Sequence, residues 1–173
     1  MDFNTLVTTV RAQKLLEPVE DNFRVLCFDP GHTTGWALFV GTKLCVCGQI
    51  NTTDIPKCVQ EVEDLFAECQ PDQIVMEDYR VYAWRAKHHA GSDMLTTRVI
   101  GSIETIAVQH FIADIIKQPA HIAKKFCTDA KLRAWNFHQK GGLKHANDAI
   151  RHGCYYLIFG AIRKADKARL TVG

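Results

Sequence analysis

Four side chains that suit metal-ion chemistry stand at the ends of predicted strands or at the start of a predicted helix. Asp29 ends the mostly apolar run FRVLCFD and precedes the loop PGHTTG. Glu77 ends the apolar run QIVME. Asp148 begins the last predicted helix, three residues after His145. Strand ends and helix starts at one edge of a sheet can converge, so these residues predict one polar site.

Converging carboxylates repel one another unless cations lie between them. Mg²⁺ suits such a site because it prefers hard oxygen ligands and retains water molecules. Two ions, roughly 3.5–4 Å apart, can activate a water and stabilise a leaving 3′-oxygen. The expected cofactor is therefore a pair of Mg²⁺ ions, with Mn²⁺ as an alternative.

Each residue also has a structural interpretation. Asp29 precedes Pro-Gly and suits a turn. Glu77 suits an exposed strand end, and Asp148 or Asn147 suits a helix N-cap. His145 suits a solvated loop. Their joint occurrence in this order favours the chemical interpretation.

The hydrophobic pattern predicts a mixed α/β layer fold around these residues. A three-stranded meander is expected within residues 23–50, a fourth strand ending near Glu77, and a fifth within FIADIIKQ. Apolar residues at helical spacing predict helices over residues 56–70 and about 93–110, a short one after Pro119, and a last one over residues 148–162.

Residues 1–22 are predicted to be an N-terminal extension, either a flexible arm or a helix. Residues 23–173 are predicted to form a single domain, since no linker or repeat divides them. The helix would present one stripe, made of Leu6 and Val10 with Ala12 or Leu15.

The composition is that of a globular protein, with 47% hydrophobic and 23% charged residues. No run approaches the roughly 20 apolar residues of a membrane span, and the N-terminus does not resemble a secretory signal. We therefore expect a cytoplasmic protein without a membrane partner. Its seven cysteines are expected to be reduced thiols, mostly buried.

The charge is unevenly distributed along the chain. Residues 1–79 carry 5 Lys+Arg and 13 Asp+Glu, a net charge of −8, whereas residues 80–173 carry 16 and 6, a net charge of +10. The second half therefore has the charge needed to hold a polyanion.

Five segments resemble RuvC-type Holliday junction resolvases in order and spacing, over roughly residues 23–160. The H-x-x-D form of the last motif is similar to bacteriophage or viral members. The resemblance implies an RNase H-like fold, with a five-stranded mixed sheet, antiparallel in its first three strands, flanked by helices. The segments are FDPGHTTGWAL, IVMEDY, TRVIGSIETIA, QPAHIAKKF and HANDAIRHG.

The resemblance also implies roles. Asp29 would bind both ions, Glu77 one ion, and Asp148 would be the last carboxylate ligand. His145 stands where many members have aspartate and shares a helical face with Asp148, so it would ligate metal or help move protons. All four are the candidate catalytic and metal-binding residues. Two departures are the segment that precedes the first strand and CTDAKLRAWNF, which lacks the Gly-rich stretch of many members.

Candidate DNA-binding residues follow Glu77 and lie near the last motifs. Aromatic and basic side chains alternate after Glu77 and suit stacking on unpaired bases, with one tyrosine as a junction wedge; a flexible basic loop is the alternative. Later lysines suit phosphate contacts. The candidates are Tyr79, Arg80, Tyr82, Arg85, Lys87, Lys124, Lys125 and Lys144.

The resemblance predicts a structure-selective endonuclease that resolves four-way junctions or other branched DNA. A four-way junction has near two-fold symmetry, so a C2 homodimer is expected, with the helix at residues 94–111 as its interface. Two alternatives stay open: a nuclease of the same fold that cuts RNA or RNA–DNA hybrids, and a branched-DNA-binding protein with weak catalysis.

Overall fold

The computed structural model describes residues 1–79, 94–112 and 114–161. Five strands form one mixed sheet in the order β3-β2-β1-β4-β5. The pairs β1·β2 and β2·β3 are antiparallel, and β1·β4 and β4·β5 are parallel. This confirms the predicted five-stranded mixed sheet. The strands are β1 (Arg24–Asp29), β2 (Thr33–Val40), β3 (Lys43–Asn51), β4 (Gln73–Glu77) and β5 (Ile115–Gln118).

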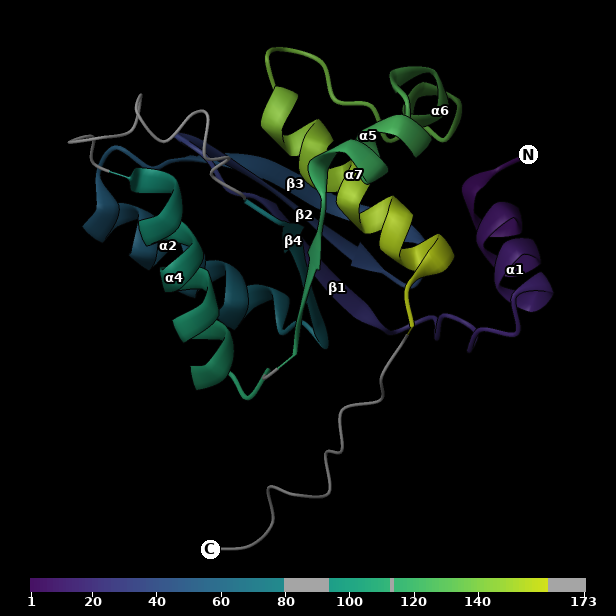
Figure 1. Cartoon of the computed structure of the whole chain (residues 1–173), viewed down its shortest axis with the longest axis horizontal. Helices are drawn as coiled ribbons and strands as arrows, with labels where there is room; N and C mark the ends of the chain where they lie inside the picture. The colour runs from purple at the N-terminus through teal and green to yellow at the C-terminus, as the bar shows by residue number, and fades with distance from the viewer. Residues whose placement is uncertain (80–93, 113, 162–173) are drawn as a thin grey trace, which may run out of the picture.

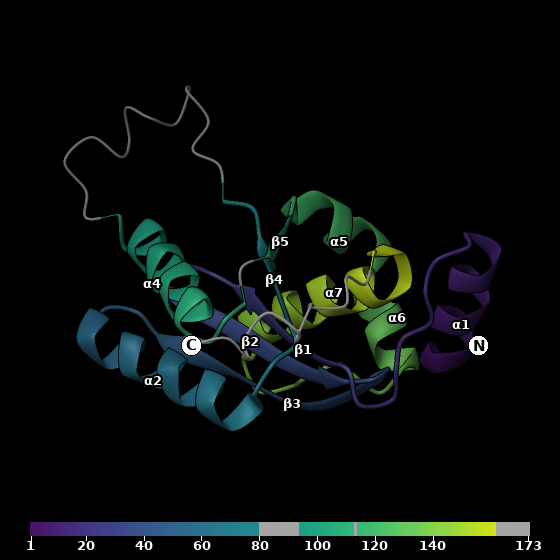
Figure 2. The ribbon, with the colours of Figure 1, turned by 90° about the horizontal axis from the view of Figure 1, so that it is seen from below.

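Helices cover both faces of the sheet (Figures 1 and 2). Helices α2 and α4 pack together on one face, where Phe66 and Ile103 belong to the apolar core. Helix α7 crosses the other face against β1 and β2, and α1 and α5 pack on α7. The helices are α1 (Phe3–Gln13), α2 (Ile55–Cys69), α4 (Leu95–Gln109), α5 (Ala120–Phe126), α6 (Asp129–Ala134) and α7 (Lys144–Phe159).

The first 22 residues contain a helix that belongs to the core. Phe3 and Val7 of α1 are buried, with the Phe3 ring 5.0 Å from that of Trp135. Arg11 is also buried and donates hydrogen bonds to carbonyl oxygens at the end of α7, those of Leu157 and Gly160, both at 2.9 Å. These bonds satisfy carbonyls that a helix end leaves unpaired.

The predicted apolar stripe of this helix was right only in part. Leu6 and Val10 are half-buried and pack against the core, whereas Leu15 is 94% exposed. The buried side chains follow an i, i+4, i+8 spacing that ends on a charged residue, Arg11. A hydrophobic pattern does not find the last position of this face, Arg11, because the cost of burying its cation is offset by specific carbonyl partners.

Two other expectations about helices need correction. Helix α7 begins at Lys144 rather than at Asp148, so Asp148 lies in its second turn and neither Asn147 nor Asp148 is the N-cap. The short helix α6 was not predicted; Thr128 caps it by accepting a hydrogen bond from the Lys131 N–H at 3.4 Å. Among the described residues, no helix has the length and apolarity needed to cross a membrane.

Candidate metal centre

The parallel pairing of β1 and β4 brings two carboxylates to one edge of the sheet. Phe28 pairs with Met76, so the next residues, Asp29 and Glu77, end neighbouring strands. Asp29 is buried and Glu77 is half-buried. Residues that are 48 positions apart in the sequence thus meet where the sequence pattern placed them.

Helix α7 delivers the other two candidates to the same edge. His145 Nδ1 lies 2.9 Å from Asp29 Oδ2, and Asp148 is buried in the next turn of α7. The approach depends on Gly35, which pairs with Asp29 across β1·β2. A Cβ at Gly35 would lie 1.9 Å from the His145 carbonyl oxygen, so only glycine allows this helix to sit so close to the sheet.

Gln49 on β3 fixes the first turn of α7. Its side-chain oxygen accepts the backbone N–H groups of His145 at 2.9 Å and Ala146 at 3.4 Å. These N–H groups belong to the first turn, which has no intrahelical acceptors for them. Gln49 pairs with Gly35 on β2, so one cross-strand pair both makes room for α7 and holds it.

Two groups of side chains at this edge could hold a metal ion. One group is Asp29, His145 and Asp148, and the other is Asp29, Glu77 and His152. Within each group, the ligand atoms all lie within 4.8 Å of one another. Ligand atoms on opposite sides of an ion, each about 2.1 Å from it, would be roughly 4.2 Å apart. Small side-chain rotations would therefore suffice to bring the atoms of either group into contact with one ion. Oxygen-rich sets with one imidazole fit Mg²⁺ or Mn²⁺.

A lysine ammonium lies among these carboxylates. Lys124 Nζ is 3.2 Å from Asp148 Oδ2 and 3.6 Å from Glu77 Oε2. Burial lowers the pKa of Lys124, but the charges of Glu77, Asp148 and Asp29 outweigh it and raise that pKa, which keeps the ammonium charged. Lys124, predicted to contact DNA, therefore lies where a cation is required.

The pKa values of the two strand-end carboxyls are shifted in opposite directions. Burial, and then the neighbouring charge and hydrogen bond of Glu77, raise the pKa of Asp29 to about 8. Partial burial raises the pKa of Glu77, but hydrogen bonds from His152 and Asp29 and the charge of Lys124 lower it to about 2. Two adjacent carboxylates ionise together only at a high energetic cost when no cation is present, which drives the two pKa values apart.

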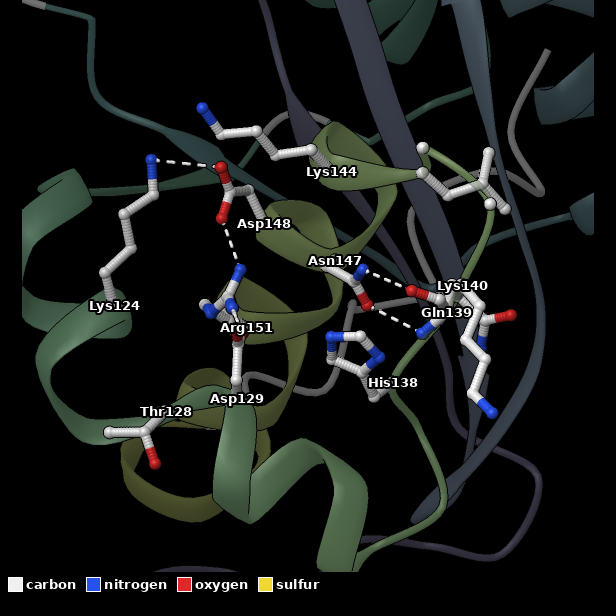
Figure 3. A pocket seen from close by; sticks show the side chains of 13 residues that line it. Lys124, Thr128, Asp129, His138, Gln139, Lys140, Lys144, Asn147, Asp148 and Arg151 are labelled. Carbon is white, nitrogen blue, oxygen red and sulfur yellow. Dashed lines mark hydrogen bonds and ion pairs between the residues drawn. The ribbon is translucent and has the colours of Figure 1, made fainter.

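Asp148 is also held from the side of α6. Arg151, one helical turn later, donates to Asp148 Oδ1 and bridges to Asp129. The same guanidinium donates from Nε to the Cys127 carbonyl oxygen at 3.0 Å. These contacts fix the Asp148 carboxylate with Oδ2 directed at Lys124 (Figure 3).

His152 is a site residue that the sequence analysis missed. Its side chain is fully buried, with Nε2 3.3 Å from Glu77 Oε2 and Nδ1 3.0 Å from Gln118 Oε1. The signal was present, because positions 145, 148 and 152 share one helical face. Gly35 and Gln49 gave no comparable signal, since their roles depend on strand register.

An open pocket of about 870 Å³ adjoins Asp148, between α5, α6 and the loop before α7 (Figure 3). Lys140 and Lys144 line it together with Asn147, whose side chain is fixed by two hydrogen bonds to the Gln139 backbone, at 2.8 and 2.9 Å. Neither lysine forms an ion pair within the part of the chain that the structure describes. The side chains of Lys140 and Lys144 are therefore available to contact the phosphates of a nucleic-acid strand that lies beside the carboxylates.

The other candidate DNA-binding residues fall into two sets. Tyr79 is half-buried directly after Glu77, and Lys125 is exposed on α5. The remaining candidates lie outside the described residues. They are Arg80, Tyr82, Arg85 and Lys87.

The fold of this chain is similar to those of several solved structures. Thermus thermophilus RuvC in complex with a Holliday junction substrate superimposes with a TM-score of 0.64 at 12% identity, covering 79% of this chain and 93% of RuvC. This protein has the fold of RuvC-like Holliday junction resolvases. The yeast mitochondrial resolvase Ydc2 gives 0.53 at 11% identity (90% and 89% covered), and the fowlpox virus resolvase 0.50 at 15% (78% and 97%).

The RuvC-like fold confirms the predicted RNase H-like architecture. No protein-family model matches the chain, and no curated protein does. At 11–15% identity these likenesses concern the fold, and the chemistry must be argued from the residues.

Proposed function

We propose that this protein is a structure-selective DNA endonuclease that resolves Holliday junctions or other branched DNA by metal-dependent phosphodiester hydrolysis. The observation that carries the proposal is the meeting of Asp29, Glu77, His145 and Asp148 at one sheet edge of a RuvC-like fold, with donor atoms spaced for cations. When bound, two Mg²⁺ ions supply an activated water and stabilise the leaving 3′-oxygen.

The chain's own residues have distinct roles in this proposal. Asp29 belongs to both candidate groups, so its carboxylate sets the spacing between them. Glu77 completes one group, and Asp148 with His145 completes the other. His145, with Nδ1 2.9 Å from Asp29 Oδ2, would either ligate the ion of this group or move protons near the leaving group; its side chain is 38% exposed and therefore open to solvent.

The DNA strand would lie along the pocket beside Asp148. Lys140 and Lys144 would neutralise its phosphates. Tyr79, with the residues that follow it, would meet unstacked bases at the branch point. Thermus thermophilus RuvC, which shares this fold, has been solved in complex with a Holliday junction substrate, and that complex supports the same class of substrate for this chain.

We also propose that the protein acts as a homodimer through α4. A two-fold substrate that needs two symmetric nicks suits a two-fold enzyme. Val108 on α4 is 64% exposed and Phe111, just beyond the end of the helix, is 72% exposed, so an apolar surface is available at this end of the helix. Sedimentation of the wild-type chain and of Phe111→Glu tests this, with a shift to monomer expected in the variant.

A nicking assay tests the proposed activity. A labelled four-way junction, a matched linear duplex and an RNA–DNA hybrid are incubated with Mg²⁺, Mn²⁺ or EDTA, with Asp29→Asn run in parallel. Paired, metal-dependent nicks in the junction that are absent in the variant are the expected result. Faster cutting of the hybrid would move the function to RNA processing. Binding of the junction without any product would make the protein a recognition factor.

A further inference from the structure

His152 is placed as a metal ligand would be, although it lies four residues beyond Asp148, the last candidate ligand of the sequence analysis. It is fully buried beneath the sheet edge, yet it contacts Glu77, one of the candidate metal-binding carboxylates. A buried imidazole must find partners for both ring nitrogens. The identity of those partners decides what His152 can do.

The partner of Nδ1 is the side chain of Gln118, the last residue of β5. Gln118 Oε1 lies 3.0 Å from His152 Nδ1, and Gln118 is itself buried. With the amide oxygen facing it, Nδ1 donates its hydrogen to Gln118, which leaves Nε2, the atom that now contacts Glu77, as the nitrogen available to a metal ion. Metal-binding histidines are oriented in this way, by donating their second N–H to an oxygen acceptor.

The Nε2 atom faces the ligand atoms of Asp29 and Glu77. Its distance to Glu77 Oε2 is 3.3 Å, longer than most N–H···O hydrogen bonds. Two ligands at right angles around an ion at about 2.1 Å would be about 3 Å apart, so the pair is spaced as adjacent ligands. A ring nitrogen of His152 also lies within 4.8 Å of a carboxylate oxygen of Asp29.

We propose that His152 is a nitrogen ligand of the ion held by Asp29 and Glu77. This inference rests on the proposed metal-dependent function and extends it. Each of the two ion positions then contains one imidazole, from His145 on one side and His152 on the other. Mn²⁺, as a first-row transition metal, binds an imidazole nitrogen more strongly than Mg²⁺ does, so the site favours Mn²⁺ over Mg²⁺.

The decisive measurement isolates one ion position. The double variant His145→Gln/Asp148→Asn keeps only the group of Asp29, Glu77 and His152. One equivalent of Mn²⁺ is added, and electron spin-echo envelope modulation is recorded for ¹⁴N coupled to the ion. A directly bound ¹⁴N is expected, and it should disappear when His152→Gln is added. No directly bound nitrogen, or no Mn²⁺ binding in the double variant, would overturn the inference.

Metal affinity provides a second readout in the otherwise unchanged protein. His152→Gln should weaken Mn²⁺ binding by about tenfold or more and Mg²⁺ binding by about threefold or less. The matched control is His110→Gln, because His110 Nε2 also contacts a glutamate, Glu63 at 2.8 Å, away from this edge. If His152→Gln weakened the binding of Mn²⁺ and Mg²⁺ equally, His152 would have a structural role and the inference would be refuted.

These measurements need no DNA, so they separate this inference from the proposed function. A directly bound nitrogen in the double variant, with no junction cleavage by the wild-type protein, would support His152 as a ligand and refute the proposed nuclease activity. Junction cleavage by the wild-type protein, with no directly bound nitrogen in the double variant, would support the nuclease activity and refute His152 as a ligand. Circular dichroism of His152→Gln checks that it folds, while the ¹⁴N signal of the double variant requires no change at position 152.

Discussion

The backbone of His145 lies directly against Gly35, the cross-strand partner of Asp29. A Cβ at position 35 would lie 1.9 Å from the His145 carbonyl oxygen, far inside van der Waals contact. The Nδ1 atom of the same histidine is 2.9 Å from Asp29 Oδ2. A single glycine therefore sets how closely α7 approaches β1, and with it the spacing of the candidate ligands.

Gly35→Ala should displace α7 and disrupt the site. We expect a loss of about 3 kcal/mol in the free energy of unfolding, since overpacking against backbone cannot be relieved by a rotamer change. Gly101→Ala is the control, because nothing lies within 4 Å of its added Cβ; in a helix it should stabilise by about 0.5–1 kcal/mol. Urea unfolding measures both, and equal stabilities would contradict the role of Gly35.

Loss of either strand-end carboxylate should abolish cleavage. Asp29→Asn and Glu77→Gln each remove a ligand whose bound cation contributes several kcal/mol to transition-state stabilisation, so nicking should fall by on the order of 10³-fold or more. Junction binding in EDTA should change little. The control Glu68→Gln alters an exposed acid on α2. Nicking by Asp29→Asn at more than a tenth of the wild-type rate would count against the site.

Lys124→Ala should tighten metal binding. The ammonium lies 3.2 Å from Asp148 Oδ2 and competes with a bound cation for that carboxylate. We expect Mg²⁺ affinity to rise by about two- to tenfold, as measured by calorimetry. Lys125→Ala, the next residue of α5, is exposed and should leave the affinity unchanged. Weaker Mg²⁺ binding in Lys124→Ala would mean that this lysine supports the ion rather than replacing it.

Without metal, the protein should become less stable as the pH rises from about 5 to 8. The pKa of Asp29 is raised from 3.8 to about 8, mainly by burial and then by Glu77. In this window the folded state keeps a proton that the unfolded state releases, so the free energy of unfolding falls, by up to about 1 kcal/mol per pH unit. The lowered pKa of Glu77 changes the free energy of unfolding only below about pH 4.5. There the stabilisation from its ionised form is lost as the pH falls, so it does not affect the range from about pH 5 to 8.

Thermal unfolding in EDTA across this pH range measures the effect. Saturating Mg²⁺ should flatten the curve, because a bound cation stabilises the ionised Asp29 carboxylate. Asp29→Asn should flatten it without metal. A rise in the melting temperature of the EDTA-treated wild type between pH 5 and 8 is the outcome that this argument does not allow.

The pocket lysines should contribute to DNA affinity without specificity. Lys140→Ala and Lys144→Ala should each weaken junction binding and reduce the slope of log K against log salt by about 1. Lys43→Ala is the control, since Lys43 pairs with Val40 at the end of the sheet away from Asp29. Fluorescence anisotropy at several salt concentrations gives both quantities. An unchanged slope would place the strand elsewhere.

Local sequence patterns predicted the strands, most of the helices and the candidate carboxylates. Apolar runs that end in Asp29 and Glu77 predicted strands and their polar ends. The order of elements predicted a mixed α/β layer fold, and the resemblance to RuvC-type resolvases predicted the mixed sheet that the structure has. Periodicity is a local property, so it can be read without knowing which elements meet. The spacing of His145 and Asp148 was sufficient to place them on one helical face for the same reason.

Several contacts that build the site are absent from any local sequence pattern. The contact of Gly35 with α7, the cap from Gln49, and the pairing of His152 with Gln118 all join residues distant in the sequence. The predicted start of α7 was also wrong, because the first N–H groups of the helix are bound by Gln49, which lies on β3 and is distant in the sequence. Local propensity cannot record such partners, since they exist only after strands and helices have packed.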